Sequence, residues 1–181
     1  NMKHPILKDL EVRKALYHLV NRKLMIEKFE YNMSKPALGP IYPESGYAAN
    51  TATPVPFNPK KALKLLRKAG WTDTDGDSIL DKVINGKKRK LSITILEPAS
   101  AFMKYLTIFK EDAKQAGVEI NIKLIEWNSF IKLIEERKFD AVRLAWSASI
   151  DWDPTQIWHT KSIKGGSNFI GFSNSEVDKL S

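Results

Sequence analysis

The feature of this sequence that most constrains its fold is a regular alternation of two apolar periods between residues 91 and 146. Apolar residues occupy every second position in 91–95 and in 118–124, as in strands with one buried face. After each of these segments, apolar residues recur every three or four positions, as on one face of a helix. A final apolar run, from Ala141 to Trp146, predicts a third strand.

The order β-α-β-α-β, within about 56 residues, predicts parallel strands joined by right-handed crossovers. We therefore predict an α/β fold with a mostly parallel sheet. The first crossover helix is expected to be closed by Gly117, and the second to begin at Asn128 or Ser129. Ligands of such sheets collect beyond the carboxyl ends of the strands.

Capping signals predict two further helices before this core. Asp9 can cap the first, and a short apolar segment follows it at residues 24–29. Asn58 and Pro59 are a typical N-cap and first-turn proline for the second helix, and Gly70 is a typical residue to end it.

A long loop separates these two helices. Residues 32–58 contain five prolines and two glycines, which predicts an extended loop in place of a helix or central strand. Near the other end of the chain, Ser173 and Glu176 form a capping box for a further helix. The length of the chain predicts a single domain over residues 1–181.

Charge and cysteine content restrict the function. The formal net charge is +8, from 29 Lys and Arg against 21 Asp and Glu, and the densest basic cluster is 87–90, after the turn signal Asn85-Gly86. No nucleic-acid-binding motif accompanies this charge, so a solvated basic face is favoured over nucleic-acid binding. The absence of cysteine excludes disulfides, thiolate metal sites and a cysteine nucleophile. No apolar run reaches the roughly 18 residues needed to span a membrane.

An aromatic and acidic segment follows the third predicted strand. Trp146, Trp152, Trp158, Asp151 and Asp153 all lie within thirteen residues. Trp152 has no strand or helix to bury it, which favours contact with a ligand, whereas Trp158 on the following helix is expected to pack. Trp146 is equally consistent with a core residue and with a pocket wall. The segment predicts a ligand-binding wall at the end of a sheet strand.

Four segments, in order along the chain, resemble the family 5 extracellular solute-binding proteins, the oligopeptide-, dipeptide- and nickel-binding family of ABC importers. The segments are NMKHPILKDLEVRKALYHLVNRKLMI, GPIYP, FNPKKALKLLRKAGWTDTDGDSILDK, and AWSASIDWDPTQIWHT with GGSNFIGFSNSEVDKL. The resemblance implies a type II periplasmic-binding-protein fold of two lobes. It also implies that the chain is the second, C-terminal lobe, with the first lobe, the signal peptide and a closing segment outside it.

The resemblance also implies site residues. An acidic residue in the segment after the third strand pairs with the ligand's α-amino group in peptide-binding relatives, and Asp151 and Asp153 compete for this position. Asp153 precedes Pro154 and can cap the next helix, so Asp151 is the better candidate for a free carboxylate. Asn168 lies near the cleft by resemblance, although a turn asparagine is also consistent with its position.

A second cluster of aspartates has the spacing of a calcium loop. Positions 1, 3, 5 and 9 of an EF-hand-type loop correspond to Asp73, Asp75, Asp77 and Asp81. Ser78 stands where the loop requires glycine, and Ile84 where it requires a bidentate glutamate. The pattern favours a solvated turn over bound calcium, and we expect no other cofactor.

Catalysis is not indicated. The three histidines, His4, His18 and His159, lie in no motif with a serine nucleophile, and no phosphate-binding loop or zinc motif is present. The resemblance implies the substrate-binding component of an ABC importer, which captures a small ligand, most simply a peptide, and delivers it to permease subunits. It would be monomeric and extracytoplasmic, held at the membrane only by the permease or a lipid anchor outside this chain. A ligand-sensing domain without transport is the alternative, and a calcium-binding structural module a weaker one.

Overall fold

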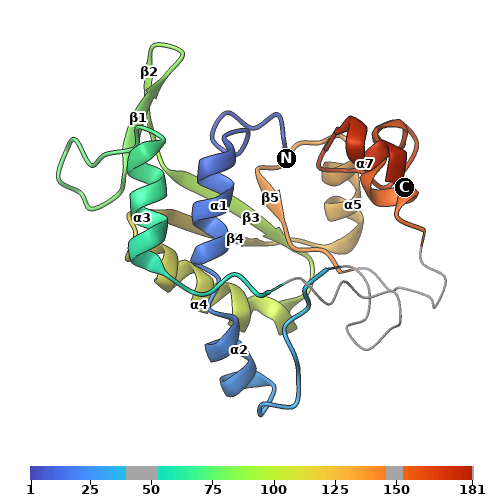
Figure 1. The fold of residues 1–181 in the computed structure, drawn as a ribbon, viewed down its shortest axis with the longest axis horizontal. Coiled ribbons are helices and arrows are strands. Elements are labelled where there is room, and N and C mark those ends of the chain that lie inside the picture. Colours follow the sequence, from blue (N-terminus) through green and yellow to red (C-terminus); the bar gives the residue numbers. More distant parts are fainter. Residues whose placement is uncertain (40–52, 146–152, 181) are drawn as a thin grey trace.

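The computed structural model describes residues 1–39, 53–145 and 153–180 (Figure 1). Their helices and strands follow the predicted alternation of types. The elements are α1 Leu10–His18, α2 Arg22–Phe29, α3 Pro59–Lys68, β1 Asp81–Ile84, β2 Lys87–Lys90, β3 Ser92–Glu97, η1 Ser100–Phe102, α4 Met103–Lys114, β4 Glu119–Leu124, α5 Trp127–Glu135, β5 Ala141–Val142, α6 Thr155–Trp158, η2 Thr160–Ile163 and α7 Ser175–Leu180.

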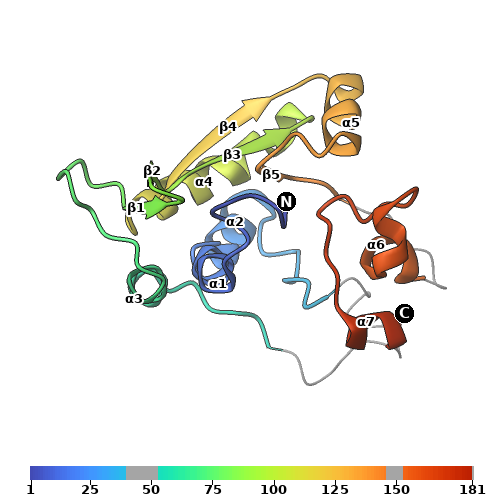
Figure 2. The ribbon, with the colours of Figure 1, turned by 90° about the horizontal axis from the view of Figure 1, so that it is seen from above.

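The three-stranded sheet has the order β4-β3-β5, and both pairs are parallel. Ser92 of β3 pairs with Glu119 of β4, and Ile95 of β3 pairs with Ala141 of β5. The predicted β-α-β-α-β unit is therefore confirmed. Because all three strands run in one direction, their carboxyl ends lie at one edge of the sheet (Figures 1 and 2).

Two apolar clusters cover the two faces of the sheet. Every second residue of 91–95 is buried in the larger cluster, which also contains residues of α1, α3 and α4. Leu96 points to the opposite face, where Phe130 and Ile134 of α5 pack with Phe139. The alternation of the strand sequence therefore separates the two clusters, because successive side chains leave a strand on opposite faces.

The predicted capping residues are confirmed for α1 and α3. The side-chain oxygen of Asp9 accepts a hydrogen bond from Glu11 N at 2.9 Å, and that of Asn58 accepts one from Lys61 N at 2.9 Å. Gly117 follows α4 with φ +75°, and a Cβ there would lie 2.7 Å from the side chain of Leu80. Glycine is therefore required at this position both for backbone conformation and for space.

Two predicted helix starts are wrong by one or two residues. Helix α5 begins at Trp127, because Glu126 caps it by accepting hydrogen bonds from Asn128 N at 2.9 Å and Ser129 N at 3.1 Å. A glutamate is long enough to replace the shorter caps that we expected at 128 or 129. Helix α7 is capped by Asn174, whose side-chain oxygen accepts hydrogen bonds from the backbone N–H groups of Glu176 and Val177.

One predicted strand is shorter in the structure, and two segments that had no predicted type form regular elements. The third strand is shorter than predicted: β5 is only Ala141–Val142. Residues 24–29 form most of a helix, α2, capped by the side chain of Asn21. The basic cluster 87–90 forms the strand β2, which pairs with β1 across the turn expected at Asn85-Gly86. In the loop predicted over 32–58, the described parts 32–39 and 53–58 contain no helix or strand, as expected.

Candidate functional site

The described part of the sheet's carboxyl edge carries a buried charge pair. Strand β3 ends at Glu97, whose side chain has no exposed surface. Its carboxylate forms an ion pair with Arg143, the residue that follows β5, and accepts hydrogen bonds from the arginine Nε and, at 3.2 Å, Nη2. The backbone N–H of Ala99 donates to the same carboxylate at 2.8 Å. The two guanidinium nitrogens that face Glu97, Nε and Nη2, therefore both donate hydrogen bonds to its carboxylate.

Arg143 also lies flat against an aromatic ring. Its guanidinium carbon is 3.6 Å from the centroid of the Phe102 ring, within the range of a cation–π contact. A quarter of the Arg143 side chain is exposed, and 40% of Phe102 is exposed. Within the described ranges, the remaining nitrogen Nη1 has no hydrogen-bond partner. Arg143 and Phe102 thus form a fixed, partly open wall at the end of β3 and β5, where ligands of parallel sheets collect.

Further aromatic side chains continue this wall towards α2. Tyr105 lies 6.0 Å from Phe102 and 5.1 Å from Phe29, measured between ring centroids. The Tyr105 hydroxyl hydrogen-bonds to the carboxylate of Glu30, which raises the pKa of the tyrosine. Lys104 Nζ lies 4.9 Å from the Phe29 centroid. Phe29, the last residue of α2, therefore packs against Tyr105 of α4 and holds the two helices together beside the carboxyl edge.

The predicted site residues are only partly described. Trp146, Asp151 and Trp152 lie outside the described residues. Asp153 is exposed, and its Oδ1 accepts a hydrogen bond from Thr155 N at 2.8 Å. Hydrogen bonding by the side chain and the backbone N–H of Thr155 lowers the pKa of the Asp153 carboxyl. The predicted capping contact is present, although Pro154 rather than Asp153 directly precedes the first residue of α6.

Asn168 is buried and organises a turn. Its amide nitrogen donates to the carbonyls of Phe172 at 2.8 Å and His159 at 3.3 Å, and its side-chain oxygen accepts from Phe172 N at 3.0 Å. Only 1% of the residue is exposed. These contacts give Asn168 a structural role in the turn, and its contact with a ligand stays a prediction. Trp158 packs edge to face on Phe172, as expected of a packing residue.

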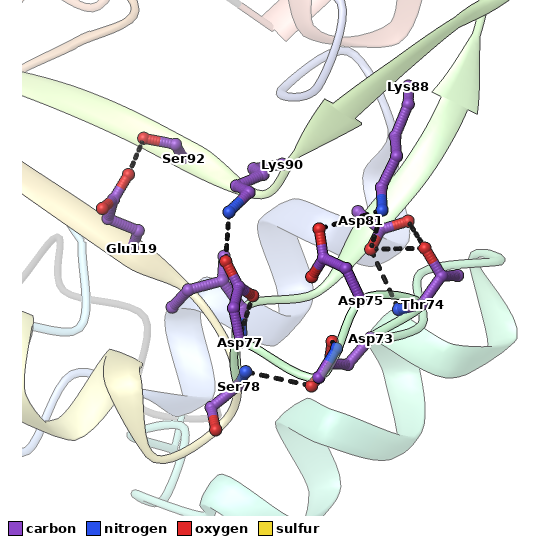
Figure 3. A network of polar contacts seen from close by, with 12 residues as sticks. Asp73, Thr74, Asp75, Asp77, Ser78, Asp81, Lys88, Lys90, Ser92 and Glu119 are labelled. Carbon is purple, nitrogen blue, oxygen red and sulfur yellow. Dashed lines mark hydrogen bonds and ion pairs between the residues drawn. The ribbon is translucent and has the colours of Figure 1, made fainter.

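The aspartate turn is held together by lysines of the adjacent hairpin (Figure 3). One carboxylate oxygen from each of Asp73, Asp75 and Asp81 lies within 4.8 Å of the others. Lys88 Nζ approaches Asp75 at 2.9 Å and Asp81 at 3.3 Å, so an ammonium group stands between two of the candidate ligands.

The other aspartates of this turn have partners as well. Asp77 pairs with Lys90, and Asp73 accepts hydrogen bonds from Gly76 N at 2.7 Å and Ser78 N at 3.0 Å. Asp81 is buried and also accepts hydrogen bonds from Thr74. Residues of the chain therefore supply the charges and donors that such a turn requires. Calcium binding by Asp73, Asp75, Asp77 and Asp81 stays the weaker alternative to a solvated turn, and nothing in these contacts requires it.

Sequence reasoning missed the pair Glu97–Arg143 and its neighbour Phe102. Glu97 ends an otherwise apolar strand, and Arg143 interrupts the apolar run that predicted the third strand. Charged residues in buried strands are almost always paired, so two of them at the ends of predicted parallel strands could have indicated a shared site.

Comparison with known proteins identifies the chain. Residues 1–168 match the bacterial extracellular solute-binding proteins, family 5 Middle. The chain belongs to this family. The oligopeptide-binding protein AppA of Bacillus subtilis (strain 168) is 32% identical over 184 residues, covering 99% of this chain and 34% of that protein. The nickel-binding periplasmic protein of Escherichia coli (strain K12) is 28% identical over 144 residues, covering 79% of this chain and 27% of that protein.

Solved structures of family members have the same fold. The structure of AppA from Bacillus subtilis in complex with a nonapeptide superposes with a TM-score of 0.88 and 31% identity, covering 99% of this chain and 36% of that chain. NikA from Brucella suis in complex with Fe(III)-EDTA gives a TM-score of 0.79 and 26% identity, with the same coverage. The chain thus has the α/β fold of part of a periplasmic binding protein, and it spans about a third of the length of these relatives.

No helix in the described ranges combines the length and apolarity needed to cross a bilayer.

Proposed function

We propose that this chain is part of the substrate-binding component of an ABC importer, which captures a small solute outside the cytoplasm and passes it to permease subunits. Membership of the family supports this role over a ligand sensor, because its relatives are named as binding proteins for peptides and nickel. Binding without chemical change also agrees with the character of the described carboxyl edge, which offers an ion pair and aromatic rings rather than an activated nucleophile.

The observation that carries the proposal is the wall formed by Arg143 and Phe102 at the carboxyl edge of the sheet. The guanidinium is fixed by Glu97 on one side and by the aromatic ring on another, yet a quarter of its side chain stays exposed. A binding site of this kind combines apolar surface with a few oriented polar groups, as small-molecule sites generally do. The second wall would come from the part of the full-length protein that this chain does not span.

A peptide is the proposed ligand. The relative with 32% identity is named as an oligopeptide-binding protein, and its structure holds a nonapeptide. Peptides offer backbone carbonyls for the N–H groups of Arg143 and side chains for the exposed ring of Phe102. Asp151 is the proposed partner of the ligand's α-amino group, since Asp153 uses one carboxylate oxygen to bond Thr155 N.

The test is ligand capture by the full-length protein. We expect peptides to co-purify with it and to be identified by mass spectrometry, and calorimetric titration to show that Arg143→Gln weakens a captured peptide at least tenfold. Arg67→Gln is the matched control, because Arg67 is an exposed arginine on α3, away from the carboxyl edge. Equal affinities in all three proteins, or the absence of any bound peptide, would contradict the proposal.

A further inference from the structure

The positive charge of Arg143 is compensated by the carboxylate of Glu97, which is fixed inside the protein. Glu97 is fully buried, and its carboxylate accepts hydrogen bonds from the guanidinium Nε and Nη2 and from Ala99 N–H. A fork of two parallel N–H groups on one carboxylate is the strongest arrangement that an arginine forms. Removing the arginine from this partner would leave a buried, unpaired carboxylate, so the pair is expected to persist when a ligand binds.

This pairing restricts what the exposed edge of Arg143 can recognise. A ligand carboxylate at Nη1 would be attracted by the guanidinium but repelled by Glu97, which lies on the opposite edge of the same group. The repulsion offsets much of the attraction, because charge interactions fall off only with the inverse of distance. A neutral carbonyl oxygen can accept the same N–H donor and has little charge to be repelled.

The ring of Phe102 favours the same kind of ligand. It lies 3.6 Å from the guanidinium carbon and is 40% exposed. An arginine that is stacked on a ring on one face and paired along one edge can offer N–H groups only in a restricted direction. The surface beside these N–H groups is the apolar ring of Phe102. An extended peptide can place a backbone carbonyl at Arg143 and an adjacent apolar side chain at Phe102, whereas a free carboxylate would have to lie beside an apolar ring.

We propose that Glu97 neutralises and positions Arg143, so that this wall selects a backbone carbonyl from within a peptide and does not anchor the peptide's terminal carboxylate. The inference rests on the proposed peptide-binding function and adds a specificity to it. Arg143 and Phe102 are the ligand-contacting residues, and Glu97 acts through Arg143 as a positioning residue. The ligand class is therefore a peptide that continues past this wall, with its carboxyl terminus elsewhere.

The experiment compares pairs of peptides with the full-length protein. Each pair, two to nine residues long, has one sequence with either a free carboxyl terminus or a carboxyl-terminal amide, and affinities are measured by calorimetric titration. For the unmodified protein we expect the acid and the amide to bind within about threefold of each other at every length that binds. For Glu97→Gln, which keeps the size but removes the charge, we expect the acid to gain at least tenfold over the amide at one length or more.

Two further variants separate this role from general support of the fold. Asp112→Asn removes the charge of another buried carboxylate, on α4, and should leave every acid-to-amide ratio unchanged. Arg143→Gln should weaken the acid and the amide equally, because the lost donor serves a carbonyl that both peptides contain. The unmodified protein, through its acid-to-amide ratios, tests the idea even if neither Glu97→Gln nor Arg143→Gln folds.

The outcomes distinguish this inference from the proposed function. A tenfold preference of the unmodified protein for free acids, an unchanged ratio in folded Glu97→Gln, or a loss confined to the acid in Arg143→Gln would each overturn the inference while leaving peptide binding intact. Failure to bind any peptide of either kind would overturn the proposed function and the inference together.

Discussion

Asp112 of α4 gives a sharp test of how this fold tolerates a buried charge. It is only 9% exposed, its Oδ2 has no hydrogen-bond partner in the described part of the chain, and its Oδ1 accepts a long hydrogen bond of 3.4 Å from Gln115 Nε2. Burial raises the pKa of the Asp112 carboxyl, against a smaller opposing effect of the Asn21 side chain. The charged form of this residue therefore destabilises the folded protein.

The direction of the pH dependence follows from this shift. A carboxyl whose pKa is higher in the folded than in the unfolded state binds its proton more tightly when folded. Its stabilising contribution is complete below the unfolded pKa, about 3.9, and is lost as the pH rises through the folded pKa. Asp112→Asn cannot ionise, so its advantage over the unmodified protein should be absent at low pH and should grow as the pH rises.

The expected magnitude comes from the unpartnered oxygen. Leaving a buried polar group without a partner costs about 1–3 kcal/mol, and more when the group is charged, so the substitution removes only the extra cost of the charge. Because Asp112 keeps some exposure and interacts with the side chains of Gln115 and Asn21, we take the lower end of this range. Asp112→Asn should therefore raise the free energy of unfolding by about 1 kcal/mol at pH 7.5, since the substitution removes the charge but keeps a polar amide.

Urea unfolding followed by circular dichroism at pH 4 and pH 7.5 measures this difference. Glu111→Gln, at the neighbouring exposed position of α4, is the matched control. It should leave the free energy of unfolding unchanged at both pH values. A destabilising effect of Asp112→Asn at pH 7.5, or an equal effect at both pH values, would refute the reasoning.

Four further predictions concern the site, the aspartate turn and the isolated chain. In the full-length protein, Asp151→Asn should leave the melting temperature unchanged and weaken a ligand with a free α-amino group by about tenfold or more, but hardly affect its N-acetylated form. Equal losses for both ligands would exclude this anchor. Asp153→Ala should instead lower the melting temperature, because Thr155 N loses its hydrogen-bond acceptor. Calcium or a chelator should leave the melting temperature unchanged, since Lys88 and Lys90 already pair with the aspartate turn; a rise with calcium in differential scanning fluorimetry would show a bound ion. The isolated 181-residue chain should unfold cooperatively in a thermal melt yet show no peptide binding by calorimetry; micromolar binding would contradict the need for a second wall.

Local features were readable from the sequence because they depend on neighbouring residues. The period of the apolar residues in 91–124 predicted strands and helices correctly, since burial on one face imposes that period on each element. The caps at Asp9 and Asn58 were predicted because a cap bonds to a backbone N–H only two or three residues away. The start of α5 was missed because its cap is Glu126, a residue type seldom used as a cap, which accepts hydrogen bonds from the N–H groups of Asn128 and Ser129.

The sequence alone thus determined the class of fold, the order of its elements and, through its motifs, the family. Only the tertiary structure decided which charges meet. Glu97 and Arg143 are 46 positions apart and pair because β3 and β5 are parallel neighbours whose register brings their ends together. Lys88 and Lys90 reach the aspartates thirteen residues earlier because the β1–β2 hairpin folds back beside that turn. Such contacts depend on strand order and register, which the local sequence pattern does not specify.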